Sequence, residues 1–230
     1  MQYNNLTIIG TSHIAKQSLD EVNDAVAKIN PDIIAIELDK RRIYALMHDE
    51  KRRPRLSDIR HIGLKGFIFS IIGAWVEKKL GQLVGIKPGS EMKQAVKLAK
   101  KNKIRLALID QDIEITLRRF SKTLTWKEKW NFLADIFKAV VLRKKEIDFD
   151  LRKVPDKKII EKLMNQTRKR YPNIYKVLVT ERNEVMANNL ADLMEKNNDK
   201  KILAIVGAGH EEEILRIIKE PMISYSVTVG

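Results

Sequence analysis

Four short apolar segments, separated by stretches with helical spacing, are the feature that most constrains the fold. Apolar runs of about four to eight residues bounded by turn signals are typical of strands buried on both faces of a sheet. Strands that alternate with helices form βαβ units, whose crossovers require a parallel sheet. The sequence therefore predicts an α/β fold with a mostly parallel central sheet, helices on both faces and a helical cap or insertion. The four predicted strands are Leu6–Gly10, Ile33–Ile36, Ile104–Ile109 and Lys201–Val206.

The remaining elements follow from the spacing of the apolar residues. Alternation of apolar and polar residues in Met222–Val229 predicts a half-exposed strand at or near a sheet edge. Thr125 and Glu128 form a capping-box pattern, which predicts the start of a helix extending to Lys145. Other segments with helical spacing are Ser18–Ile29, Ser90 to about Asn102, Asp156–Lys169, about Ile174 to Lys196, and Glu211–Ile218.

Composition excludes several classes of protein. The 230 residues are 44% hydrophobic and 32% charged, which indicates a folded chain and not a disordered one. The absence of cysteine excludes a disulfide scaffold, an iron–sulfur protein, a thiolate zinc site and a cysteine nucleophile. Residues 1–10 show no basic region followed by a long apolar one, so we expect no signal peptide and a cytoplasmic location.

The net charge of +14 is concentrated in the middle of the chain. Lys40–Lys65 holds nine positive and three negative residues, and Arg118–Arg170 holds seventeen and seven. The simplest interpretation is a set of solvated helix faces, and the alternative is steering of an acidic peptide or contact with an anionic membrane surface. Nucleic acid is not expected, because that surface needs aromatic residues among the cations and Trp126 and Trp130 are interpreted as packing anchors.

Gly66–Val76 is an uncharged, mostly apolar stretch of eleven residues. It is too short to cross a bilayer, which takes about 20 apolar residues, so no transmembrane helix is predicted. A core helix, a dimer face and a membrane-surface contact all explain it. We expect a homodimer.

Polar residues stand at or just after the carboxyl ends of the four predicted strands. They are His13, Glu37, Asp110 and His210, and both histidines occur in Gly-x-x-His turns. Ligands of open parallel sheets bind beyond these strand ends, and neighbouring strands lie about 4.8 Å apart. Glu37 directly ends an apolar run, where a carboxylate is costly unless it binds a cation or forms an ion pair, here with Arg41 or Arg42.

Two neutral imidazoles and one carboxylate are a typical ligand set for a divalent metal with an open position for water. The predicted ligands are His13, Glu37 and His210, and the metal is Mn, Co or Zn. Asp110 or Glu181 is expected as an acid/base or supporting group. Arg42, Arg118 or Arg182 is expected to bind the developing oxyanion or a substrate carboxylate, and Glu91 is a further substrate-binding candidate.

Seven motifs, in order along the chain, resemble the TraB/PrgY family, of archaeal type, which is related to the TIKI metalloproteases and to the erythromycin-esterase and ChaN-like group. The resemblance covers about Leu6 to Ile218. The motifs are Gly10-Thr11-Ser12-His13, Glu37-Leu38-Asp39-x-x-Arg42, Gly89-x-Glu91-Met92, Leu108-Ile109-Asp110-x-Asp112-Ile113, Ile115-Thr116-Leu117-Arg118-Arg119, Glu181-Arg182-Asn183 and Val206-Gly207-Ala208-Gly209-His210.

The resemblance implies a single TraB-like domain over residues 1–230. Its α/β core would comprise about residues 1–50, 88–120 and 172–230, with helical insertions at about 51–87 and 121–171. TIKI members are described as metal-dependent proteases with two Gly-x-x-His motifs and an essential Glu, which correspond here to His13, His210 and Glu37. PrgY-type members are linked to shutdown of a peptide pheromone. Archaeal members often carry C-terminal transmembrane helices, so this chain is expected to be either a compact soluble member or a piece of a membrane-anchored protein.

The sequence thus favours a metal-dependent hydrolase of a peptide or of a small amide or ester. A non-enzymatic protein that sequesters a peptide or a porphyrin is the first alternative. A metal-free esterase-like enzyme, with a histidine as general base, is the second.

Overall fold

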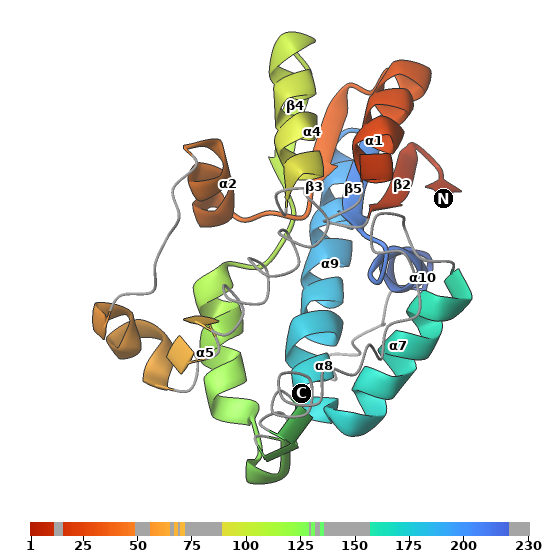
Figure 1. Cartoon of the computed structure of the whole chain (residues 1–230). Coiled ribbons are helices and arrows are strands. Elements are labelled where there is room, and N and C mark those ends of the chain that lie inside the picture. The colour runs from red at the N-terminus through yellow and green to blue at the C-terminus, as the bar shows by residue number, and fades with distance from the viewer. Residues whose placement is uncertain are drawn as a thin grey trace, which may run out of the picture.

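The computed structural model of the chain describes the residues in nine stretches: 1–11, 16–48, 56–64, 67–68, 70–71, 89–128, 130–131, 134–135 and 157–220. Within this part, a five-stranded sheet lies between helices in the upper half of the view in Figure 1. Its strands are β1 (Gln2–Tyr3), β2 (Leu6–Thr11), β3 (Ile33–Ile36), β4 (Arg105–Leu108) and β5 (Ile202–Gly207).

The strand order is β1-β2-β5-β3-β4. The four strands β2, β5, β3 and β4 are parallel, and β1 pairs with β2 in the antiparallel sense. The last described strand along the chain, β5, therefore lies between β2 and β3. Because the four main strands are parallel, their carboxyl ends share one edge of the sheet.

Helices cover both faces of the sheet, as predicted. On one face, α1 (Lys16–Ile29) and α4 (Ser90–Lys101) pack against Ile34, Ile36 and Ile205. On the other, α9 (Glu181–Lys196) and α10 (Glu211–Lys219) pack against Ile8 and Val206. Burial on both faces explains why β3 and β5 are apolar at every position.

The four predicted strands and most predicted helices are confirmed within one or two residues. The segment predicted as one helix from about Ile174 is continuous but changes pitch along its length. It begins as α8 (Pro172–Tyr175), passes through a π-helical segment, η2 (Lys176–Thr180), and continues as α9. The helix predicted at Asp156–Lys169 is α7 (Lys157–Arg170).

Several elements were not predicted. The two-residue strand β1 carries no usable pattern, and the 3₁₀ turn η1 (Leu56–Asp58) is similarly short. Two helices begin at aspartates that sequence analysis considered only as site or motif residues: Asp39 caps α2 (Lys40–Met47), and Asp112 caps α5 (Ile113–Thr123).

Two further predictions concern the region after α5. The capping box is confirmed, because Glu128 N–H donates to Thr125 Oγ1 at 3.3 Å and Thr125 N–H donates to Glu128 Oε2 at 3.2 Å. The interpretation of Trp126 and Trp130 as packing anchors is wrong: their exposed fractions are 73% and 68%. Both lie on a helical turn that no described element covers closely enough to bury them.

Three predicted segments lie wholly or mostly outside the described residues. They are the strand Met222–Val229, the apolar stretch Gly66–Val76, and the part of the helix beyond Glu128 that was predicted to reach Lys145. In the part of the chain that is described, no helix is both long enough and apolar enough to cross a membrane.

Candidate functional site

The candidate site begins with Glu37, the residue that follows β3. Glu37 is 4% exposed, and both carboxylate oxygens are bound. Its Oε1 accepts from Nη2 of Arg182 on α9, and its Oε2 accepts from the backbone N–H of Gly207, the last residue of β5, at 2.6 Å. The guanidinium that contacts Glu37 is thus that of Arg182, whereas Arg41 and Arg42 contact other carboxylates. The predicted ion pair exists with a different partner.

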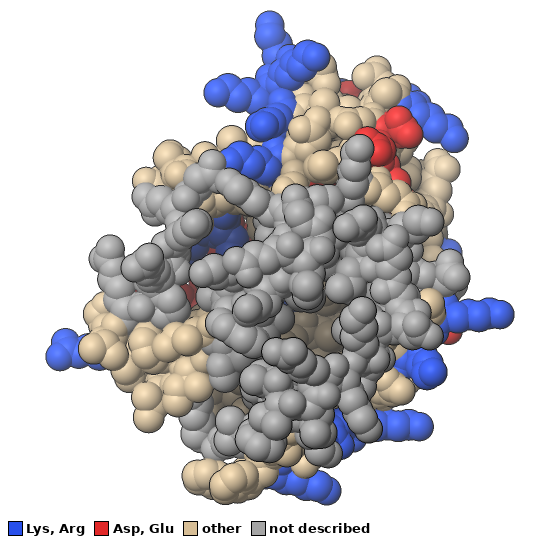
Figure 2. Space-filling view, in the orientation of Figure 1, with Lys and Arg blue, Asp and Glu red and all other residues tan. Residues whose placement is uncertain are grey.

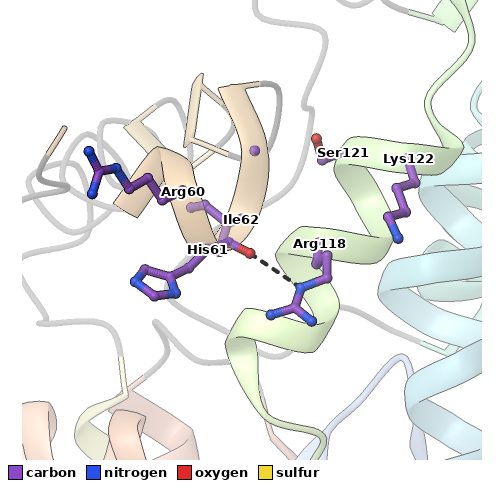
Figure 3. Close-up of a pocket in the computed structure, with 7 residues that line it drawn as sticks. Arg60, His61, Ile62, Arg118, Ser121 and Lys122 are labelled. Atoms are coloured by element: carbon purple, nitrogen blue, oxygen red, sulfur yellow. Dashed lines mark hydrogen bonds between the residues drawn. The ribbon is translucent and has the colours of Figure 1, made fainter. Parts of the chain in front are cut away.

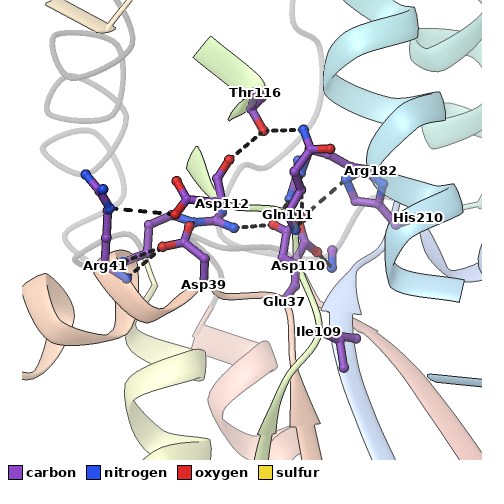
Figure 4. A network of polar contacts seen from close by, with 12 residues as sticks. Glu37, Asp39, Arg41, Ile109, Asp110, Gln111, Asp112, Thr116, Arg182 and His210 are labelled. Carbon is purple, nitrogen blue, oxygen red and sulfur yellow. Dashed lines mark hydrogen bonds and ion pairs between the residues drawn. The ribbon is translucent and has the colours of Figure 1, made fainter. Parts of the chain in front are cut away.

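Asp110, two residues beyond β4, binds the same arginine. Nε of Arg182 donates to Oδ1 of Asp110 at 3.1 Å, and Nη2 donates to Oδ2 at 2.6 Å. The side chain of Asp110 is completely buried. Arg182 therefore bridges the carboxylates that follow two adjacent strands (Figure 4).

A second arginine reaches Asp110 from α2. Nη2 of Arg42 donates to Oδ2 of Asp110, and Nε of Arg42 donates to Oδ2 of Asp39 at 2.6 Å. The other oxygen of Asp39 caps the helix by accepting from the N–H groups of Arg41 and Arg42. Asp39 thus has two functions: it starts α2 and holds the Arg42 guanidinium toward Asp110.

Neighbouring opposite charges keep the buried carboxylate and guanidinium groups of this network ionised. Burial disfavours the charged form of Asp110, but the hydrogen bonds and charges of Arg182 and Arg42 outweigh burial and hold its pKa below the usual range. Burial likewise opposes the charge of Arg182, but Glu37 and Asp110 hold its pKa above the usual value. The pKa of Arg42 is raised in the same way, against burial, chiefly by Asp110. We therefore treat these three groups as charged at neutral pH.

His210 lies at the N-terminus of α10, three residues beyond the end of β5. Its Nδ1 lies 2.5 Å from Oδ1 of Asn183, which is 1% exposed, and its Nε2 lies 3.6 Å from Oε1 of Glu37. An amide oxygen can only accept, so this contact places the imidazole proton on Nδ1 in the neutral tautomer. The lone pair is then on Nε2, the nitrogen that faces Glu37. Asn183 was quoted in a motif but not predicted as a site residue.

The carboxyl end of β2, with Gly10 and Thr11, lies beside the carboxyl end of β5. Thr11 of β2 is the register partner of Gly207, and Ala208 N–H donates to Thr11 O at 2.9 Å. A Cβ added at Gly10 would lie 2.9 Å from Cα of Ala208, so the two strand ends approach too closely for a side chain there. His13 itself is outside the described residues, and its role as a ligand stays a prediction.

Glu181 and Arg118, two other predicted residues, make contacts outside the Arg182 network. Glu181 binds Arg119 of α5, with Arg119 Nη2 2.6 Å from Oε1. Arg118 donates from Nε to the carbonyl oxygen of His61 at 3.2 Å and lines a cavity of about 300 Å³ (Figure 3). Glu91 is 2% exposed in the first turn of α4. Their predicted roles are not tested by these positions.

The donor chemistry of Glu37 and His210 fits a divalent metal in kind, since a carboxylate and a neutral imidazole are common ligands. The hydrogen bond from His210 Nδ1 also has the form that orients metal-bound histidines. The described residues alone, however, contain no group of three His, Asp or Glu side chains arranged to hold a metal. Glu37 also already accepts from Arg182 at Oε1, so a cation there would compete with a guanidinium.

Comparison with known proteins agrees with this set of motifs. A sequence model of the TraB/PrgY/gumN family matches residues 2–220. The chain belongs to the TraB/PrgY/gumN family. An uncharacterized protein of Methanocaldococcus jannaschii is 38% identical over 216 residues, covering 93% of this chain and 53% of its own length. The TraB domain-containing proteins of mouse and human are each 24% identical over 192 residues, covering 76% of this chain and 49% of their own. The chain thus spans about half the length of the relatives that it matches.

Proposed function

We propose that this chain is a hydrolase that cleaves a peptide or a small amide or ester substrate at the carboxyl edge of the sheet. The observation that supports this most is the orientation of His210. Asn183 fixes the ring through Nδ1, so that the basic Nε2 faces the buried cluster of Glu37, Asp110, Arg182 and Arg42. A histidine oriented through one nitrogen beside charged groups is the usual arrangement for a general base.

In the proposed reaction, Nε2 of His210 accepts a proton from the attacking water. The water oxygen bonds to the substrate carbonyl carbon, and the π electron pair moves to the carbonyl oxygen. When the carbonyl re-forms, the bond to the leaving nitrogen or oxygen breaks, and His210 returns the proton to that atom. Arg42, whose side chain is 28% exposed, is the network's most accessible cation for an oxyanion or a substrate carboxylate.

Metal dependence is part of the proposal. His13, Glu37 and His210 would hold a Mn, Co or Zn ion, which when bound supplies a Lewis acid and lowers the pKa of its water. With a metal bound, Asn183 would orient His210 as a metal ligand and not as a general base. Arg182 would balance the negative charge that remains on Glu37. Asp110 serves as a supporting group in both forms.

The test uses protein purified without added metal, assayed against a library of peptides and esters before and after addition of each metal. We expect His210→Ala to lower kcat/KM by about 10²–10⁴-fold with its fold intact. Arg105→Ala, at an exposed arginine that starts β4 on the opposite edge of the sheet, is the control and should keep full activity. Unchanged cleavage by His210→Ala would exclude the proposed site.

Two variants distinguish a metal-dependent reaction from one in which His210 acts as general base without metal. If metal is required, His13→Ala loses both activity and bound metal by elemental analysis; if His210 acts as base without metal, activity survives chelation. Asn183→Asp places a carboxylate on Nδ1, so His210 keeps its proton to higher pH and the acidic limb of the pH profile moves upward. Tight peptide or porphyrin binding without turnover, lost in His210→Ala, would instead show a sequestering protein.

A further inference from the structure

Two tryptophans lie on one face of a single helical turn that follows α5. Trp126 and Trp130 are four residues apart, so they lie on the same side of the helix. They are 73% and 68% exposed. A tryptophan buries more apolar area than almost any other side chain, so leaving two of them largely in water points to an external contact.

The turn that carries them is fixed to the rest of the protein. Glu128, on the same turn, is 3% exposed and accepts from the backbone N–H of Asn173 at 2.7 Å and from its side-chain amide at 2.9 Å. Together with the capping box at Thr125, these bonds hold the turn against the start of α8. The tryptophans are therefore presented from a supported position.

Cations surround the same turn. A cavity of about 450 Å³ beside it is lined by Lys127, Lys169 and Arg170, together with Glu128 and uncharged residues. Four neutral donors stabilise the Glu128 carboxylate. Three cations thus stand against the two carboxylates Glu128 and Asp135. Arg170 also binds Asp135, with Nη2 2.5 Å from Oδ1, whereas Lys127 and Lys169 are exposed. The local balance is positive, and Figure 2 shows Lys and Arg projecting from the side and end of the molecule where Figure 1 places α7 and α8.

The arrangement matches a bilayer surface better than a nucleic acid. Proteins that bind single strands line a basic groove with the aromatic rings on which bases stack. Here the cations line the cavity, and neither tryptophan is among its lining residues. Indole rings beside lysines suit the headgroup level of a membrane, where the rings enter the interface and the ammonium groups meet lipid phosphates.

We propose that the surface formed by Trp126, Trp130, Lys127 and Lys169 docks on an anionic phospholipid bilayer. The tryptophans insert at the interface, and the lysines supply the preference for anionic lipid. This contact is independent of the proposed hydrolase site, which lies at the sheet edge. The two tryptophans would then contact the membrane and not pack inside the protein.

The experiment is co-sedimentation of the full chain with vesicles of phosphatidylcholine alone or of phosphatidylcholine mixed with phosphatidylglycerol. Binding is expected only to the mixed vesicles and should weaken as salt increases. The double variant Trp126→Ala/Trp130→Ala should partition on the order of tenfold less. Lys127→Glu/Lys169→Glu should lose binding to a similar or greater degree, since each lysine near the surface contributes roughly fivefold.

Lys100→Glu/Lys101→Glu on α4 makes the same charge change at the opposite end of the view in Figure 1, and should bind as the unchanged protein does. Circular dichroism checks that each variant is folded; these side chains are exposed, so folding should persist. Equal loss in the α4 variant would reduce the effect to net charge and overturn the proposal. Absence of vesicle binding, with binding to single-stranded DNA or dimerisation through the tryptophans, would overturn it as well.

Discussion

Arg182 and Arg119 both bind a carboxylate on another element, yet their surroundings differ completely. The side chain of Arg182 is 14% exposed and joins two carboxylates that are 3% and 0% exposed. That of Arg119 is 47% exposed and binds Glu181, the sequence neighbour of Arg182. Adjacent positions of α9 thus contribute to a largely buried charge cluster and to a more exposed pair. The comparison shows that burial, and not the presence of an ion pair, marks the candidate site.

Removing the buried guanidinium should produce the largest effect. Arg182→Met leaves Glu37 and Asp110 without their shared cation, and breaking a buried pair costs about 3–5 kcal/mol. Urea unfolding measures the loss. Arg182→Lys, which keeps the charge but not the two-pronged geometry, should recover part of it. A cost no larger than that of Arg119→Met would break the distinction between the two arginines.

Glu128 sharpens the comparison because its partners are neutral. Like Glu37 it is nearly inaccessible, but its oxygens accept from the amides of Asn173 and Thr125 and from a hydroxyl. Glu128→Gln turns an acceptor into a donor facing other donors, so we expect a loss of about 1–3 kcal/mol in urea unfolding. Asp192→Asn, in an exposed pair, is the control and should change little. A neutral effect of Glu128→Gln would show that those contacts add nothing.

The fall of the unfolding free energy at acid pH should depend in part on the ionisation of Asp110. Its folded-state pKa is depressed, so its contribution is fully present above its ordinary pKa of 3.8 and is lost as the pH falls through the folded value. Across that window, its share of the slope is about 1.4 kcal/mol per pH unit. Asp110→Asn removes the titrating group, so its unfolding free energy should vary less with pH below 3.8 than that of the parent chain. An identical slope would contradict the ionised form of Asp110.

The smallest effect is expected at the surface pair. Arg119→Met and Glu181→Gln, singly and together, should leave the unfolding free energy almost unchanged, since exposed pairs are screened and entropically costly. Any residual coupling in the double-mutant cycle should disappear in high salt. A coupling energy that persists in high salt would show that this pair behaves like the buried ion pairs of Arg182.

Much of the fold was predictable because burial leaves a strong sequence pattern. Ile33–Ile36 and Ile202–Gly207 are apolar throughout, as strands covered on both faces must be. Gln2–Tyr3 is too short to carry any period, and the strand order depends on contacts distant in sequence. The π-helical segment before Glu181 was also not predicted, because its five residues are too few to define a period of their own.

Several members of the candidate site were predictable, but their pairing was not. Glu37, Asp110 and His210 could be proposed because strand ends in a parallel sheet converge on one edge. The sequence paired Glu37 with Arg41 or Arg42, whereas its partner in the structure is Arg182. Glu181 and Arg182 are neighbours in one helix, and the sequence did not show which of them reaches the sheet edge. Successive residues on a helix point about 100° apart, so the rotation of α9 against the sheet decides which one faces inward. That rotation is set by its buried face, which includes Asn183, Met186 and Leu190.

The central position of β5 has a consequence for synthesis on the ribosome. Without residues 202–207, β2 and β3 have no shared neighbour, and Glu37 lacks the Gly207 N–H that binds it. The amino-terminal half of the sheet must therefore wait for a strand made some 170 residues later than Glu37. During that interval its apolar strands lack cover along one edge, the condition in which nascent chains rely on chaperones.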